Sequence, residues 1–161
     1  MSEPTVDGLR RWILSHLAPD LPGLEDVKVS IVGDLTFQPV ELPAGPALAL
    51  PPRWRFTFEA AQHLPQLPKE HKCTRLHGHS YRIEAGAKDQ ARLKPLLKEI
   101  HDELDHRCLN DIDGLEQATC EIIAAWIWRR LAAKIDDLTV VVVRETDTAS
   151  CIYSGPGQGG L

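Results

Sequence analysis

The sequence predicts an α+β domain, an antiparallel sheet with two helices on one face, preceded by an N-terminal helix–strand extension. Three observations support this prediction. Aromatic residues alternate with other residues over 54–61, apolar residues recur at helical spacing over 89–106 and 119–131, and β-branched residues dominate 138–143. With a second strand over 77–85 and a short final strand, the order of elements is β-β-α-α-β-β.

An N-terminal region, residues 1–50, is predicted to be distinct from the main domain, residues 51–161, because the segment that joins them is rich in Pro, Ala and Gly. Apolar residues at helical spacing predict a helix over 5–17. Alternation predicts a strand over 27–32, with 35–42 as its hairpin partner. Two roles stay open for this region: it completes the sheet of the main domain, or it is a partial duplication of the C-terminal helix and strands.

Within the main domain, turn and cap residues mark the ends of the elements. The first strand ends in a loop, because Pro65 and Pro68 cannot donate to a strand ladder. Thr119 is expected to cap the second helix with its hydroxyl, and Glu121 is favourably placed in the first turn.

Composition and charge argue against several classes of function. A net charge of −5 in 161 residues disfavours a general nucleic-acid-binding protein, which carries a basic surface. No stretch approaches the ~20 apolar residues of a membrane helix. The N-terminus, Met1-Ser2-Glu3-Pro4, shows neither the basic segment nor the apolar segment of a signal peptide. We therefore expect a cytoplasmic protein. The four cysteines are widely spaced, without a C-x-x-C pair, and are expected to be free thiols.

His77 and His79 are the most informative pair of residues in the chain. Side chains alternate along a strand, so two imidazoles two positions apart point to the same face. A catalytic zinc site has three protein ligands and one open position, and these histidines supply two of the three. Cys73 adds a thiol between the cationic residues Lys72 and Arg75. The two histidines alone also fit the polar end of a surface strand.

Several separated segments, in order, carry a resemblance to a known family. They are Phe56-Thr57-Phe58-Glu59-Ala60-Ala61, Leu64-Pro65, His71-Lys72-Cys73, Arg75-Leu76-His77-Gly78-His79, Leu104-Asp105-His106, Leu109-Asn110-Asp111, Gly114-Leu115-Glu116, Trp126-Ile127-Trp128 and Val143-Arg144-Glu145-Thr146. Together they resemble the 6-pyruvoyltetrahydropterin synthase family, and within it the 6-carboxytetrahydropterin synthase branch, whose C-x-x-x-H-G-H spacing is matched.

The resemblance implies the tunnelling fold (T-fold) and a homo-oligomer with active sites between subunits. It implies a zinc-dependent lyase that converts 7,8-dihydroneopterin triphosphate to 6-carboxy-5,6,7,8-tetrahydropterin, with release of acetaldehyde and triphosphate. This product lies on the route to 7-deazapurines such as queuosine. His77 and His79 would be ligands of Zn²⁺, which would act on the substrate as a Lewis acid and a template.

The resemblance also implies roles for four further residues. Cys73 would be the base that abstracts the substrate proton, and Asp105 and His106 would form a second proton-transfer pair. Glu145 would anchor the pterin by accepting hydrogen bonds from its amidine N–H groups.

One position departs from the family pattern. The family carries its first zinc histidine in a motif of the form F-x-A-A-H-x-L, but here Gln62 holds that place and His63 follows it. A shift of one residue along a strand reverses the face of the side chain. Three alternatives are open: a bulge turns His63 inward, Gln62 offers its amide oxygen, or the chain binds zinc weakly or not at all. His63 is the predicted third ligand and Gln62 the alternative.

A second departure lies between the second strand and the first helix. Only residues 84–88 separate them, where the family continues through a hairpin. We therefore expect the sheet to lack most of one strand, which would leave an exposed edge and change the usual oligomer. The N-terminal strands are candidates to replace the missing pairing.

Three functions fit these observations. The first is the lyase, which acts on a small-molecule pterin and binds neither nucleic acid nor membrane. The second is a diverged paralogue that binds a pterin or purine without full catalysis, as the glutamine at position 62 suggests. The third is a structural or metal-binding subunit that pairs with an intact family member. The complete set of acid–base residues favours the lyase.

Overall fold

The structure is a computed structural model that describes residues 5–29, 35, 37–40 and 50–157. The chain divides into two compact units, Met1–Asp34 and Leu35–Leu161, and each is described by itself. Among the described residues, no helix is both long enough and apolar enough to cross a bilayer.

The first unit contains helix α1 (Val6–Leu17), which confirms the helix predicted over 5–17. Its N-terminus is capped by the Thr5 hydroxyl, which accepts a hydrogen bond from the N–H of Gly8 in the first turn. The described part of the strand predicted over 27–32, residues 27–29, is irregular, and the remainder lies outside the described residues. The Val27 carbonyl accepts a hydrogen bond from Arg10 Nε at 3.2 Å, so a side chain takes the place of a strand partner here.

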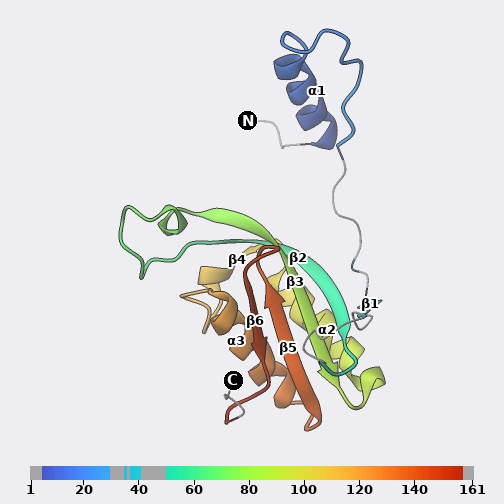
Figure 1. Cartoon of the computed structure of the whole chain (residues 1–161), viewed down its shortest axis with the longest axis vertical. Helices are drawn as coiled ribbons and strands as arrows, with labels where there is room; N and C mark the ends of the chain where they lie inside the picture. The colour runs from blue at the N-terminus through green and yellow to red at the C-terminus, as the bar shows by residue number, and fades with distance from the viewer. Residues whose placement is uncertain (1–4, 30–34, 36, 41–49, 158–161) are drawn as a thin grey trace. The chain divides into compact units, whose positions relative to one another are not determined.

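The second unit is built on a six-stranded sheet whose central part is four antiparallel strands (Figure 1). They are β2 (Trp54–Gln62), β3 (His77–Ala87), β5 (Leu138–Arg144) and β6 (Ser150–Tyr153), which lie side by side in that order. Val140, Val141, Val142 and Val143 of β5 are buried, and the strand lies inside the sheet, between β3 and β6. The predicted α+β class and T-fold order are therefore what the structure shows.

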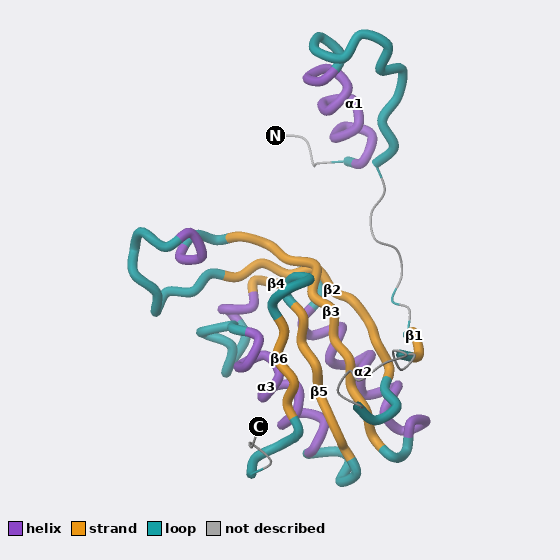
Figure 2. The backbone as a smooth tube through the Cα atoms, in the orientation of Figure 1, coloured by secondary structure: helices purple, strands orange, loops and turns teal. Residues whose placement is uncertain are grey.

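Two helices cover one face of this sheet (Figure 2). Helix α2 (Gln90–Leu104) begins at its cap residue Asp89, and helix α3 (Cys120–Ala132) begins at Thr119, whose hydroxyl accepts from the N–H of Ile122 as the sequence predicted. The inward side chains of strands and helices form the core, in which Phe56, Phe58, Tyr81, Ile83, Leu93, Leu97, Ile123 and Ile127 are almost fully buried.

The outer edge of β2 is partly covered by two short strands. β1 (Gln38–Pro39) pairs antiparallel with Trp54 and Arg55, and β4 (Arg107–Cys108) pairs parallel with Ala60 and Ala61. Of the strand predicted over 35–42, Gln38 and Pro39 are the described residues that pair. They pair with the main domain, which is one of the two roles that the sequence left open for residues 1–50; that assignment stays a prediction.

The expected loss of most of one strand is wrong. The chain passes from β3 to α2 through Lys88 and Asp89 alone, and β3 still pairs directly with β5 from Arg82 to Ala87. The short connection therefore shortens a turn and leaves the four central strands continuous, because the neighbour of β3 comes from the C-terminal part of the chain rather than from a local hairpin.

Candidate active site

The two histidines of the H-x-H motif lie at the start of β3, on one face of the strand. The register pairs His77 with Gln62 and His79 with Ala60. Residues that stand opposite each other in an antiparallel pair share a face, so Gln62 lies on the histidine side. The last residue of β2 is thus brought to the histidines by strand pairing, without a bulge.

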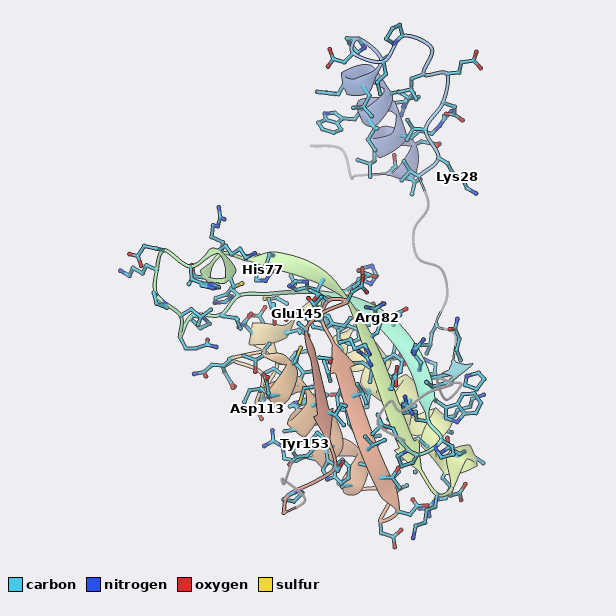
Figure 3. The ribbon with its side chains drawn as sticks, in the orientation of Figure 1. Lys28, His77, Arg82, Asp113, Glu145 and Tyr153 are labelled. Carbon is cyan, nitrogen blue, oxygen red and sulfur yellow. The ribbon has the colours of Figure 1, made fainter. Side chains whose placement is uncertain are left out.

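Glu145 completes a compact group with these histidines. Ligand atoms of His77, His79 and Glu145 lie within 4.8 Å of one another. The carboxylate reaches them because Glu145 directly follows β5, the neighbour of β3 in the sheet, and Figure 3 shows His77 and Glu145 near the same end of these strands. Gln62 Nε2 donates a hydrogen bond to Glu145 Oε1.

The tautomer of His77 is fixed by the backbone. Its Nδ1 lies 2.7 Å from the carbonyl oxygen of Arg75, and since a carbonyl can only accept, Nδ1 carries the proton. Nε2 then keeps a free lone pair. A backbone carbonyl that accepts from the second ring nitrogen is the usual support of a metal-binding histidine.

Buried polar atoms without a hydrogen-bond partner concentrate at this place. They include Gln62 Oε1, His79 Nε2 and the Tyr81 hydroxyl. His79 Nε2 lies 2.9 Å from Glu145 Oε1, but the two groups are not aligned for a hydrogen bond. Buried polar atoms are normally paired, so this concentration indicates a ligand, and imidazole plus carboxylate is a donor set that suits a divalent transition metal. The residues present therefore fit the Zn²⁺ that the sequence predicted.

Cys73 lines the same cavity as His77, His79 and Glu145. The cavity has a volume of about 530 Å³. Cys73 stands in a single helical turn, η1 (Lys72–Thr74), within the loop that joins β2 to β3 (Figure 1). Its carbonyl accepts from the N–H of Leu64 at 2.8 Å, and this bond closes the loop.

His63, the predicted third ligand, is not part of this group. Asn110 fixes its backbone twice: Oδ1 accepts from the His63 N–H and Nδ2 donates to the His63 carbonyl, each at 2.8 Å. Because β2 runs regularly to Gln62, the side chain of the next residue is not turned inward by a bulge. Sequence reasoning gave Asn110 no role, although it lies in one of the matched segments.

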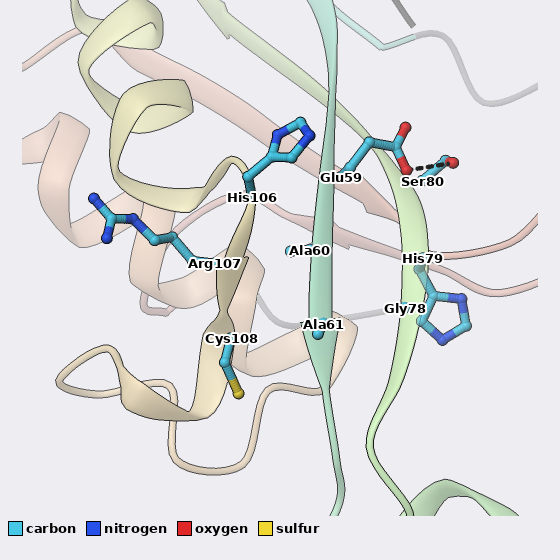
Figure 4. Close-up of a pocket in the computed structure, with 9 residues that line it drawn as sticks. All are labelled: Glu59, Ala60, Ala61, Gly78, His79, Ser80, His106, Arg107 and Cys108. Carbon is cyan, nitrogen blue, oxygen red and sulfur yellow. Dashed lines mark hydrogen bonds between the residues drawn. The ribbon is translucent and has the colours of Figure 1, made fainter. Parts of the chain in front are cut away.

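His106 lines a second cavity, of about 480 Å³. Residues of β2, β3 and β4 form the rest of its lining (Figure 4). Among the residues that line the two cavities, His79 is the one they share. The predicted base Cys73 and the predicted proton-transfer residue His106 thus line different cavities among the described residues.

The Asp105–His106 pair is nevertheless well formed. Asp105 Oδ2 lies 2.7 Å from His106 Nδ1, and Oδ1 accepts from the N–H of Glu59 at 3.0 Å. Burial raises the pKa of Asp105, but the hydrogen bonds from Glu59 and His106 outweigh burial and hold that pKa below its ordinary value. The backbone of His106 has a φ of 55°, which residues other than glycine rarely adopt. Its N–H donates to the Glu59 carbonyl at 2.6 Å.

A family model described as 6-pyruvoyl tetrahydropterin synthase matches residues 53–156 of this chain. The chain belongs to this family. A curated relative, the 6-carboxy-5,6,7,8-tetrahydropterin synthase of Synechocystis, is 41% identical over 121 residues, which cover 63% of this chain and 90% of the relative. The protein of the same name from Bacillus subtilis is 33% identical over 109 residues, which cover 55% of this chain and 74% of the relative.

Solved structures agree with the T-fold of this family. The 6-pyruvoyl tetrahydropterin synthase of Caenorhabditis elegans gives a TM-score of 0.58 at 24% identity, covering 64% of this chain and 93% of that chain. An uncharacterized protein from Wolinella succinogenes gives a TM-score of 0.51 at 17% identity, covering 63% of this chain and 96% of that chain. The family and fold that the sequence predicted are confirmed.

Cys120, to which the sequence assigned no role, contacts the site of this family member. Its Sγ donates to Glu145 Oε2 at 3.8 Å. Burial, and next the charge of Glu145, raise the pKa of Cys120 to about 11, so the group is a neutral thiol near pH 7. Its place one residue after a helix cap gives no local signal of this contact, which arises where α3 packs on β5.

Proposed function

We propose that this protein is a 6-carboxytetrahydropterin synthase-like lyase that acts on 7,8-dihydroneopterin triphosphate. The observation that carries this proposal is the cavity that Cys73 lines together with the close group His77, His79 and Glu145. Two curated relatives that bear the name 6-carboxy-5,6,7,8-tetrahydropterin synthase support the choice of reaction.

His77 and His79 would hold a zinc ion in this cavity. When bound, zinc supplies a Lewis acid that polarises oxygen atoms of the substrate side chain. The protein's own part is to present both imidazoles from one face of β3 and to fix the His77 tautomer through the Arg75 carbonyl.

Cys73 is the proposed acceptor of the substrate proton. Cys73 lines the same cavity as His77 and His79, so a substrate bound in this cavity would have its side chain close to Cys73. Lys72 and Arg75 line the same cavity and contribute positive charge, which suits a substrate that carries a triphosphate.

Asp105 and His106 are the proposed second proton-transfer pair, and they act from another subunit. The ring nitrogen that faces Asp105 is fixed by its carboxylate, and the His106 side chain is 70% exposed, so its other nitrogen is free to reach a neighbouring molecule. Because His106 and Cys73 line different cavities of one chain, we infer a homo-oligomer in which each active site combines residues from two copies.

The second candidate is a diverged protein that binds a pterin or purine without full turnover. Gln62, in place of a histidine, is the observation that favours it. The two candidates are separated by incubating the zinc-loaded protein with 7,8-dihydroneopterin triphosphate and identifying the pterin product by mass spectrometry. The lyase predicts 6-carboxytetrahydropterin; substrate that is bound and recovered unchanged contradicts the lyase and supports the binding protein.

A further inference from the structure

We propose that the cation in this cavity is held by His77, His79 and Glu145, and that Gln62 acts as the positioning residue that orients the Glu145 carboxylate. The inference rests on the metal use that the proposed function includes. It assigns Glu145 to the metal rather than to the pterin, and it gives a role to the glutamine at position 62.

The spacing of the polar atoms supports three ligands on one cation. Zinc binds imidazole nitrogen and carboxylate oxygen at about 2.0 to 2.2 Å, so two neighbouring ligand atoms lie roughly 3 to 3.5 Å apart. His79 Nε2 and Glu145 Oε1 lie 2.9 Å apart without forming a hydrogen bond, and the whole group lies within 4.8 Å. Two close polar atoms that do not bond to each other are the arrangement expected when both point toward a third partner.

The direction of the Gln62 amide shows which part it plays. Its side chain is fully buried, and its Nε2, which can only donate, faces Glu145 Oε1. The reverse orientation would set the amide oxygen against a carboxylate oxygen and is disfavoured. The donor end of Gln62 therefore points into the group, and an amide nitrogen that carries two protons does not bind a cation. Gln62 acts on the metal through Glu145.

Glu145 keeps the capacity for a metal but not for a two-point contact with a pterin. Its Oε1 has two lone pairs, of which Gln62 uses one and leaves the other on the side of His79. Its Oε2 accepts from Cys120 Sγ at 3.8 Å. Both oxygens thus already have partners within the chain, and a pterin that bound both would have to displace them.

Two imidazoles and one carboxylate form a known donor set of catalytic zinc. A first-row divalent cation such as Zn²⁺ or Co²⁺ suits these ligands. The carboxylate brings one negative charge to the cation, and its orientation through a buried amide is the kind of supporting hydrogen bond on which metal affinity depends.

The test is the affinity of metal-free protein for Zn²⁺, measured by competition with a chromophoric chelator, with the visible absorption of the Co²⁺ form as a second measure of ligand number. We expect Glu145→Gln to weaken the affinity by more than about 100-fold, and Gln62→Ala to weaken it by about 10- to 100-fold, the range typical of supporting residues. His63→Ala is the matched control, because it lies one position from Gln62 and outside the group; its affinity should equal that of the wild type.

Two results would overturn the assignment. One is a Glu145→Gln protein that binds Zn²⁺ as the wild type does and loses affinity for the pterin instead. The other is a His63→Ala protein that loses the metal. If Glu145→Gln does not fold, Glu145→Asp carries the test: it keeps the charge but withdraws the carboxylate by one methylene group, and unchanged Zn²⁺ affinity in that variant would equally overturn the proposal.

These affinities are independent of catalysis, so the two proposals fail separately. A wild-type protein that binds Zn²⁺ through Glu145 but yields no new pterin would refute the lyase and leave the metal assignment standing. If the wild-type protein turns over substrate and the Glu145→Gln protein keeps its metal, the metal assignment is refuted and the lyase stands.

Discussion

The buried amide of Gln62 donates a hydrogen bond to the carboxylate of Glu145 and so joins the end of β2 to the residue that follows β5. These two residues are separated by 83 positions in the sequence. Because β3 lies between the two strands, the bond spans the strand that carries His77 and His79. The position at which the chain departs from its family is thus connected directly to the proposed metal site.

Replacing Cys73 by alanine should abolish turnover and leave the fold intact. The thiol lines the cavity from a partly exposed turn and supports no core packing, so the change in the free energy of unfolding should stay within about 0.5 kcal/mol. Product formation and urea unfolding, measured on the same preparation, check both parts. Normal turnover would remove Cys73 from the mechanism.

Mixed oligomers should recover activity from two inactive chains. Cys73→Ala and His106→Ala each remove one part of the proposed site, and these parts line different cavities of a single chain. If neighbouring subunits share active sites, co-assembled chains contain some sites with both residues intact. We expect measurable turnover from the co-assembled protein and none from either variant alone. Inactive mixed oligomers of normal size would contradict the shared site.

Glu84 should be the most important single charge for stability. Its side chain is 1% exposed and accepts hydrogen bonds from Arg53 and Arg55. Removing one partner of a buried pair leaves the others uncompensated, so Glu84→Gln should lower the free energy of unfolding by about 3 to 5 kcal/mol. Glu103→Gln, which breaks the half-exposed pair with Arg130, is the control and should cost less than about 1 kcal/mol.

The stability difference between wild type and Glu84→Gln should also depend on pH. Burial raises the pKa of Glu84. The hydrogen bonds from Arg53 and Arg55 lower this pKa by more than burial raises it, so the pKa lies below its ordinary value of 4.5. A carboxyl with a depressed pKa stabilises the folded state above its unfolded pKa, and this stabilisation is lost as the pH falls through the folded value. Urea unfolding should therefore show a large difference at pH 7 that shrinks progressively below about pH 4.5. A difference that is constant with pH would contradict this account.

Asn110 should stabilise both the fold and the metal site. It bonds to the backbone N–H and carbonyl of His63 and also donates to the Glu116 carbonyl at 2.9 Å. Asn110→Ala leaves these backbone groups without partners, at a cost of about 1 to 3 kcal/mol, and frees the end of β2 that carries Gln62. Asn110→Asp keeps the acceptor and loses the donor, so it should be less destabilised. Equal stability of wild type and Asn110→Ala would contradict this role.

The elements of the fold that depend on local or regular sequence patterns could be predicted from the sequence. The apolar spacing and the cap at Thr119 predicted α3, and the β-branched run predicted β5. The shared face of His77 and His79 followed from the alternation of a strand alone. The expected missing strand was wrong because β3 takes its partner from the C-terminal part of the chain, a pairing that a local connection does not reveal.

The arrangement of the site depends on long-range pairing, which the sequence does not give. The inward face of Gln62 follows from its register with His77, and without that register the sequence favoured His63 as the third ligand. The contact of Glu145 with Gln62 depends on the order of three strands. The placement of His106 and Cys73 in different cavities depends on the pairing of β4 with β2. The sequence motifs that contain these two residues do not reveal this pairing.

The most direct test of the account is the ratio of acetaldehyde to 6-carboxytetrahydropterin produced by the zinc-loaded wild type from 7,8-dihydroneopterin triphosphate. The proposed lyase should release equal amounts of the two products, and Cys73→Ala should form neither product under the same conditions. A pterin product that forms without acetaldehyde, or at the same rate in the Cys73→Ala protein, would contradict the proposed lyase at this cavity.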